Sequence, residues 1–131
     1  GYTTRLKLIL VCFGDHPLPF EWIDRLAEWG FTGLMLDTAN KIEGSLTERL
    51  DLTTISRFVS AVRRHKLLCG LAGSLGEQDI DALVPLKPDY LGFRGALCFG
   101  NRTGQISEQA TESILARLRS AHLLPSGHAY V

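Results

Sequence analysis

Two side chains suited to proton transfer, Asp37 and Lys41, follow a short apolar segment of the chain. The segment 33–36 is apolar throughout, as expected of a parallel strand that is buried on both faces. A carboxylate and an amine at the end of such a strand are groups used for acid–base catalysis or for imine formation with a carbonyl substrate. The alternative, a solvated surface lysine in a polar loop, stays open at this point.

Polar residues and glycines follow three further apolar segments in the same way. Because the carboxyl ends of parallel strands meet at one edge of a sheet, we expect all these groups to line one site. Turn amides and a hydroxyl at a helix start, with a guanidinium nearby, are suited to binding a phosphate. The same residues also fit ordinary roles as helix caps and turn formers. The residues concerned are Asp15 after segment 6–13, Gly73 and Ser74 after segment 67–72, and Arg94, Gly95 and Ala96 after segment 90–93.

The elements that would position these groups alternate along the chain in the order β-α-β-α-β-α-β-α. The spacing of the strands fits right-handed parallel crossovers. Residues 38–51 are predicted to form a polar loop. Apolar runs predict strands over 6–13, 33–37, 67–72 and 90–93, and helical periodicity predicts helices over 20–29, 52–65, 74–86 and 107–121.

Local signals mark the ends of these helices. Gly30 is placed to end the first helix in a left-handed conformation. Ser74 and Glu77 have the spacing of a capping box, which predicts that the third helix begins at Ser74. Ser107 is placed to cap the last helix. The inward positions expected for the second helix are Leu52, Ile55, Phe58, Val59 and Val62.

Composition limits the classes of partner. The chain has 131 residues, 45% of them hydrophobic, which fits one domain over 1–131 with irregular tails at 1–5 and 124–131. Fourteen basic and fourteen acidic residues balance, so we expect neither nucleic acid nor a membrane as partner. We expect no metal and no cofactor, because metal-ligand spacings and nucleotide-binding motifs are missing from the sequence.

Cysteine usage indicates the compartment. Cys12, Cys69 and Cys98 are an odd number of widely spaced residues inside apolar runs. This pattern predicts reduced thiols in a cytoplasmic protein. Two architectures accept four β/α units: an open doubly wound sheet, and half of a TIM-type (β/α)8 barrel, which needs roughly 250 residues when complete.

Three motifs together resemble one family. The motifs are LMLDTANK over 34–41, LCGLAGSL over 68–75 and GFRGALC over 92–98. Over about residues 6–120 they resemble the C-terminal half of the (5-formylfuran-3-yl)methyl phosphate synthase family of methanofuran biosynthesis. The resemblance implies the barrel architecture, with four parallel β/α units corresponding to strands 5–8.

The resemblance also implies a reaction. Members of this family are lyases that condense two molecules of glyceraldehyde 3-phosphate, with loss of phosphate and water, through an imine on a lysine. Lys41 then corresponds to an active-site lysine and Asp37 to its carboxylate partner, with Asp15 at the end of the fifth strand. The turn residues Gly73, Ser74, Arg94, Gly95 and Ala96 would line phosphate sites.

The chain departs from the family in lacking the first four units, which carry the lysine expected to form the imine. We therefore expect the fragment alone to be inactive, and expect its exposed strand edges and apolar sheet face to form a homo-oligomer. Two alternatives remain. One is another barrel enzyme of one-carbon cofactor (tetrahydromethanopterin or methanofuran) synthesis, and the other is a non-catalytic half-barrel assembly module.

Overall fold

A computed structural model describes residues 6–40, 44–93, 95–97 and 105–121. The predicted tails 1–5 and 124–131 lie outside these ranges. So do three residues singled out in the sequence, Lys41, Arg94 and Cys98.

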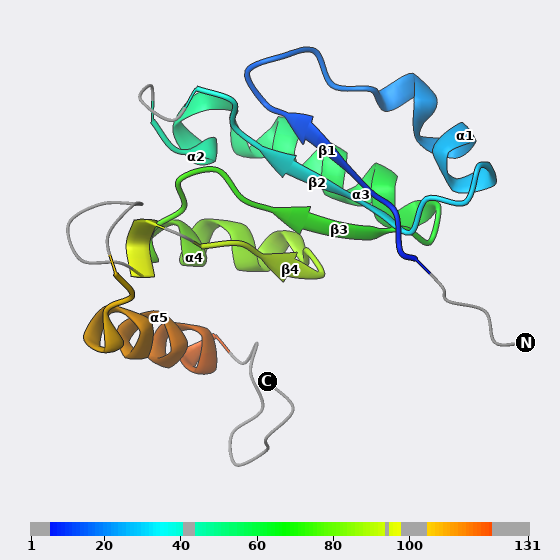
Figure 1. Ribbon diagram of the computed structural model, residues 1–131. Helices are drawn as coiled ribbons and strands as arrows, with labels where there is room; N and C mark the ends of the chain where they lie inside the picture. Colours follow the sequence, from blue (N-terminus) through cyan, green and yellow to red (C-terminus); the bar gives the residue numbers. More distant parts are fainter. Residues whose placement is uncertain (1–5, 41–43, 94, 98–104, 122–131) are drawn as a thin grey trace, which may run out of the picture.

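The four predicted strands form one parallel sheet in the order β1-β2-β3-β4, which confirms the expected β/α succession (Figure 1). Three strands are shorter than predicted. Pairing begins where Ile9 meets Gly33, so Leu6 and Leu8 precede the sheet and are exposed. The strands are β1 (Ile9–Phe13), β2 (Gly33–Asp37), β3 (Leu68–Leu71) and β4 (Tyr90–Leu91).

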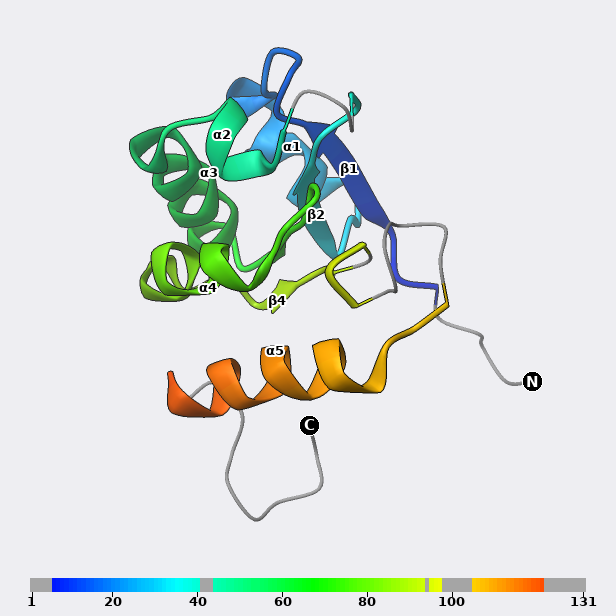
Figure 2. The same ribbon diagram turned by 90° about the vertical axis from the view of Figure 1, so that its left-hand side faces the viewer.

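The helices α1, α3 and α4 lie on one face of the sheet, and α5 lies beside the β4 edge (Figures 1 and 2). Gly30 ends the first helical segment with φ +97°, as predicted. Ser107 caps α5 by accepting the Ala110 N–H at 3.1 Å, also as predicted. The longer elements are α1 (Ile23–Glu28) after the 3₁₀ turn η1 (Phe20–Trp22), α3 (Leu52–Arg64), α4 (Glu77–Leu83) running into η2 (Val84–Leu86), and α5 (Glu108–Ser120).

The core lies between the sheet and the helices. Strand residues Leu34, Leu36 and Leu71 are completely buried there against α3. Because α3 has apolar residues at helical spacing, one side of this helix is buried from solvent. The buried α3 residues are Ile55, Phe58, Val59 and Val62, as predicted. Leu52 was predicted to point inward and is instead 44% exposed, because it starts the helix beyond the edge of the core.

The opposite face of the sheet carries no α-helix among the described residues (Figure 2). Residues paired in register share a face, so Ile9, Val11 and Phe13 point to this side together with Met35 and Asp37. We call it the open face. Its exposure follows from the placement of α1, α3 and α4, which all lie on the other face.

Residues 38–51, predicted to be a loop, contain a further short helix, α2 (Leu46–Arg49). The Glu48 carboxylate accepts the Ser45 N–H at 2.9 Å, which is half of a capping box. Leu46 is fully buried and fixes the turn to the core. The serine–glutamate spacing was the available signal for this helix.

Cys12 and Cys69, two of the three cysteines predicted to be reduced thiols, are buried and are not joined in a disulfide. Burial raises the pKa of Cys12 to about 11 and that of Cys69 to about 12. Both are therefore neutral packing residues at physiological pH. In the described part of the chain, none of the helices combines the length and apolar content needed to cross a bilayer.

Candidate active site at the strand ends

The strand ends are fixed to one another by short backbone hydrogen bonds. The Gly14 N–H donates to the Asp37 carbonyl at 2.7 Å, which joins the ends of β1 and β2. The Ala72 N–H donates to the Leu36 carbonyl at 2.7 Å, which joins β2 to the end of β3. Three of the four predicted groups therefore meet at one edge.

Asp37 ends β2 opposite Phe13, so its side chain belongs to the open face of the sheet. It is half-buried, and its Oδ1 accepts the N–H of Thr38 at 2.7 Å. Thr38 itself is completely buried. The carboxylate thus sits on a rigid strand end with access to the open face. Lys41, its predicted partner, lies outside the described residues.

Asp15 connects the end of β1 to the segment that leads to Lys41. Its Oδ1 accepts the Ala39 N–H at 3.0 Å, and its Oδ2 accepts the Asn40 N–H at 2.8 Å. These two amides lower the pKa of Asp15 to about 2. A carboxylate so poorly basic is suited to holding the loop. Its proposed catalytic role stays a prediction.

The other side of the Lys41 segment is anchored to the turn after β3. The Leu46 N–H donates to the Gly73 carbonyl at 2.9 Å. The Thr47 hydroxyl donates to Asp79 at 2.5 Å and pairs with Ser45 at 3.0 Å. Asp79 is almost fully buried, so this polar contact lies inside the protein. The described residues on either side of 41–43 are thus tied to the strand ends.

Gly73 and Ser74 form the turn after β3, with φ values of +114° and +50°. A Cβ at Gly73 would lie 3.0 Å from Thr38 Cγ2 and 3.1 Å from Thr38 N, so only glycine fits without a shift. Ser74 adopts a left-handed conformation that non-glycine residues rarely take, and its side chain is exposed. The turn is therefore constrained, with Gly73 buried and the Ser74 side chain accessible at the edge.

The predicted capping box at Ser74 and Glu77 is wrong. Helix α4 begins at Glu77, and its N-cap residue is Gly76 in an extended conformation. The carboxylate that accepts the Gly76 N–H, at 2.7 Å, belongs to Asp79. Ser74 cannot cap the helix because its left-handed backbone turns the chain two residues earlier. Its hydroxyl is thus not used as a helix cap.

The fourth predicted group is only partly described. Gly95 and Ala96 belong to a 3₁₀ turn, η3 (Gly95–Leu97), which the sequence did not predict, and Arg94 lies outside the described residues. Ala96 borders a cavity of about 330 Å³, and Glu77 is the charged residue among those that the structure describes in its lining. An anionic lining does not favour phosphate in that cavity. The remaining lining residues are Ser107, Gln109, Ala110, Ser113 and Ile114.

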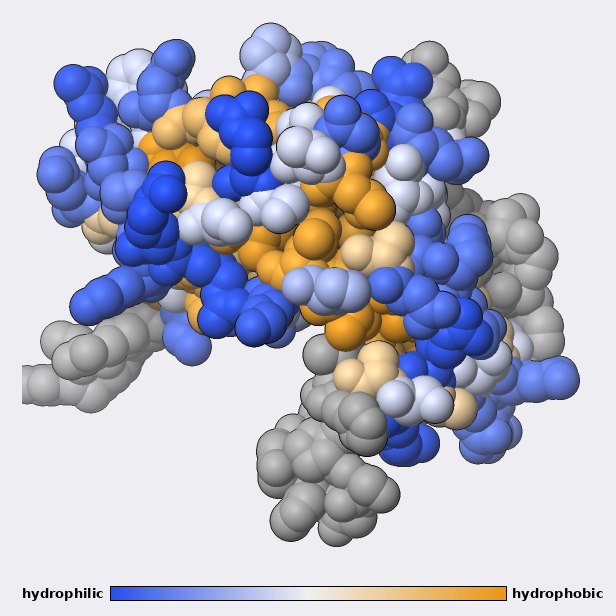
Figure 3. All heavy atoms as spheres, turned by 180° about the vertical axis from the view of Figure 1, so that it is seen from behind, coloured by the Kyte–Doolittle hydropathy of each residue, from blue (hydrophilic) through white to orange (hydrophobic). Residues whose placement is uncertain are grey.

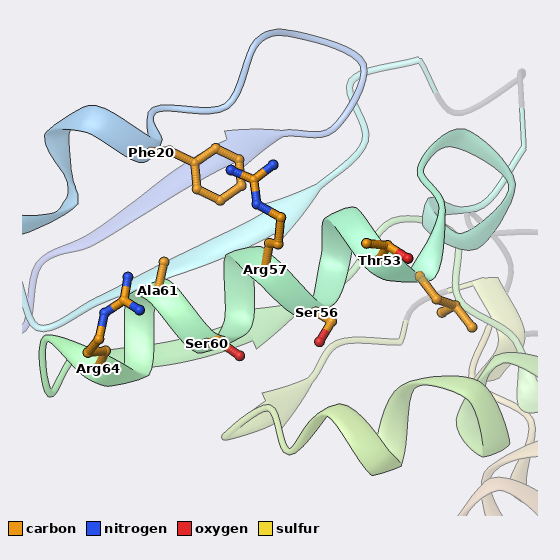
Figure 4. A pocket seen from close by; sticks show the side chains of 8 residues that line it. Phe20, Thr53, Ser56, Arg57, Ser60, Ala61 and Arg64 are labelled. Carbon is orange, nitrogen blue, oxygen red and sulfur yellow. The ribbon is translucent and has the colours of Figure 1, made fainter.

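A larger groove of about 610 Å³ runs along the outer side of α3 (Figure 4). The Arg57 guanidinium lies over the Phe20 ring, 4.5 Å from its centroid, at one side of this groove. Hydrophobic residues also reach the surface on this helix side, surrounded by polar ones (Figure 3). The groove shares no residue with the strand ends, so we do not place the active site there. The remaining lining residues are Leu52, Thr53, Ser56, Ser60, Ala61 and Arg64.

Among the described residues no cluster of three or more histidine, cysteine, aspartate or glutamate side chains could hold a metal ion. The arrangement at the strand ends is instead a carboxylate on the open face, a clamped loop and a glycine turn. Such groups at the carboxyl ends of parallel strands are typical of β/α enzymes.

The fold is TIM-barrel-like. A crystal structure of phosphoribosyl anthranilate isomerase from Thermus thermophilus matches with a TM-score of 0.62 at 17% identity, over 88% of this chain and 51% of that one. At this identity the match concerns the fold alone.

The family model for 4-HFC-P synthase matches residues 2–115, and the chain belongs to this family. It is similar to the (5-formylfuran-3-yl)methyl phosphate synthase of Methanothermobacter thermautotrophicus, at 38% identity over 78% of this chain and 44% of the relative. A Methylorubrum extorquens protein assigned the same activity is 45% identical over 70% of this chain and 39% of the relative. The chain thus spans about half the length of these relatives or less.

Proposed function

We propose that the chain supplies strands five to eight of a (5-formylfuran-3-yl)methyl phosphate synthase. The enzyme is a lyase of methanofuran biosynthesis that condenses two glyceraldehyde 3-phosphate molecules with loss of phosphate and water. The observation that carries the proposal is the family match over residues 2–115, which spans every strand end of the candidate site. Two buried unpaired thiols, Cys12 and Cys69, fit the reducing conditions of the cytoplasm, where we place this activity.

In this proposal, Asp37 and Lys41 transfer protons. A proton is removed from one triose to make a carbon nucleophile. This nucleophile attacks the aldehyde of the second triose, whose oxygen then takes up a proton. The half-buried Asp37 carboxylate on the open face has access to a substrate held inside the barrel. The imine would form on a lysine of the other four units.

Phosphate binding is assigned to two turns in the same proposal. In the turn after β3, Ser74 follows the buried Gly73 and has an exposed side chain at the strand ends. Arg94, Gly95 and Ala96 follow the next strand and would contribute a positive charge and further amides. Two neighbouring turns match the need to hold phosphorylated substrates by groups that take no part in the chemistry.

The test is an assay of the chain combined with the other four units from the Methanothermobacter thermautotrophicus relative. We expect the furan aldehyde product from glyceraldehyde 3-phosphate, and borohydride should trap the imine on a lysine. Lys41→Ala should lower kcat at least ~100-fold, the usual scale for losing a general acid or base. The matched control is Lys7→Ala, an exposed lysine before β1. Equal turnover of Lys41→Ala and the unmodified protein would reject the role of Lys41.

A further inference from the structure

An aromatic ring on β4 lies across a glycine of β3 on the open face of the sheet. Gly70 pairs in register with both Met35 and Tyr90, so all three positions belong to this face. A Cβ at Gly70 would overlap Cε2 and Cζ of the Tyr90 ring and would lie 2.6 Å from its Cδ2. Gly70 is buried although its side of the sheet carries no α-helix. The Tyr90 ring therefore covers Gly70 directly.

The next row of residues toward the carboxyl ends of the strands combines a carboxylate with two small residues. Asp37 pairs with Phe13, and Ala72 and Gly92 follow the last paired residues of β3 and β4. A Cβ at Gly92 would lie 3.2 Å from the Cβ of Ala72, so these two positions face the same side of the sheet. On the β3 side of Asp37, the open face thus carries no group larger than a methyl.

The Tyr90 ring lies below this row. Tyr90 and Gly70 precede Gly92 and Ala72 by two residues, which is about 6.6 Å along a strand. In the barrel of the proposed function, the row of Asp37 lies nearer the mouth and the row of Tyr90 lies further inside. A triose phosphate held by its phosphate at the turn after β3 would extend past Ala72 toward the ring.

We propose that Tyr90 forms the floor of the substrate pocket beside Asp37 and restricts this pocket to a three-carbon aldehyde phosphate. The inference rests on the proposed function and adds to it a residue that determines specificity. Because Gly70 has no Cβ, the ring can lie against the backbone and leave the space above it free. A substrate with one more carbon between its phosphate and its aldehyde would have to displace the ring.

The charge state of Tyr90 is compatible with this role. Its side chain is half-buried, and burial raises the pKa of Tyr90 above its usual value. The hydroxyl is therefore protonated at neutral pH, and the floor carries no negative charge that would repel a phosphorylated substrate.

The experiment uses the chain combined with the other four units, as in the assay of the proposed function. This enzyme receives an equimolar mixture of glyceraldehyde 3-phosphate and erythrose 4-phosphate, which is one carbon longer. Mass spectrometry then measures the ratio of seven-carbon to six-carbon condensation product. Tyr90→Ala should raise this ratio at least ~10-fold, the lower end of the discrimination that a pocket achieves for one methylene. The matched control, Tyr90→Phe, keeps the ring and should give the ratio of the unmodified enzyme.

Gly70→Ala provides an independent variant should Tyr90→Ala fail to fold. Its added Cβ would push the Tyr90 ring away from the sheet and into the substrate pocket. We expect the KM for glyceraldehyde 3-phosphate to rise roughly 10-fold, the scale of a modest overpacking cost. The double variant Gly70→Ala/Tyr90→Ala should lose most of this increase, because the displaced ring is no longer present.

The possible outcomes separate this inference from the proposed function. If Tyr90→Ala forms the six-carbon product at an unchanged product ratio, the floor is rejected and the proposed function stands. An unchanged KM for Gly70→Ala would reject the floor in the same way. If the unmodified combined enzyme forms no furan aldehyde, the proposed function fails and the role of Tyr90 fails with it.

Discussion

At the residue scale, Asp15 links two strand ends through its charge. Its two oxygens accept the N–H groups of Ala39 and Asn40, the residues that lead to Lys41. Charged acceptors make stronger hydrogen bonds than neutral ones. The charge of Asp15 therefore holds the backbone on which the proposed catalytic lysine depends.

This clamp predicts an acid-sensitive contribution to stability. The pKa of Asp15 is lowered from 3.8 to about 2 in the folded chain. A lowered pKa means that the stabilisation is full above pH 3.8 and is lost as the pH falls toward 2. Asp15→Asn should remove this part of the acid transition, as followed by urea unfolding at a series of pH values.

The matched control is Asp24→Asn. Asp24 is exposed and accepts the N–H of its neighbour Arg25 instead of that of a distant segment, so its replacement should affect urea unfolding less than Asp15→Asn does. In the combined enzyme, Asp15→Asn should lower kcat with little change in KM, because it loosens the loop without touching bound phosphate. Identical pH profiles for Asp15→Asn and the unmodified chain would contradict the clamp.

At the element scale, α2 and α4 are joined by one buried carboxylate. Asp79 accepts the Thr47 hydroxyl from α2 and the Gly76 N–H at the start of α4. Removing it leaves a backbone N–H and a hydroxyl without their acceptor in a nearly buried position. The connection fixes the turn between β3 and α4, which carries the proposed phosphate contacts.

We therefore expect Asp79→Ala to lower the free energy of unfolding by about 1–3 kcal/mol, the usual penalty for unsatisfied buried groups. Asp81→Ala is the matched control on the same helix. Asp81 pairs with Arg117 at 2.7 Å but its side chain is 66% exposed, so its loss should change stability by less than about 1 kcal/mol. Denaturant unfolding distinguishes the two, and equal effects would contradict the buried anchor.

Most elements were predictable because their signals are local. The apolar period of α3, its charged outer side and the run that forms β2 all depend on nearby residues. Ser45–Glu48 and Ser74–Glu77 have the same spacing, yet only the first marks a helix start. The difference is tertiary, because the positive φ of Gly73 and Ser74 depends on packing against Thr38.

The candidate site was predictable in outline only. Parallel strand order is enough to bring Asp15, Asp37 and the Gly73 turn to one edge. The clamp by Asp15 was not predictable, since its partners are 24 and 25 residues away in the chain. Nor was the anchor between Thr47 and Asp79, separated by 32 residues. Hydrogen bonds at such distances leave no periodic pattern in a sequence.

At the scale of the whole molecule, the described helices cover only one of the two faces of the sheet. On the helix-covered face Leu34, Leu36 and Leu71 are completely buried, while on the open face Val11 and Phe13 are 44% and 39% exposed. Proteins rarely leave a continuous apolar face without a partner. Association through that face should therefore contribute to the stability of the fold itself.

This coupling predicts that the other four β/α units of the proposed enzyme stabilise the chain when they are added as a separate protein. A partner that binds only the folded chain adds about 1.4 kcal/mol of stability for each tenfold increase in its concentration above its Kd. The urea midpoint of the unmodified chain should therefore rise steadily with the concentration of these units. Val11→Asp, which places a charge on the open face, should show no such rise, whereas Leu52→Asp, a change at a residue of α3 that is also 44% exposed, should behave like the unmodified chain. Circular dichroism, with the signal of the added units subtracted, measures this. A midpoint of the unmodified chain that does not move would mean that these units do not cover its apolar face.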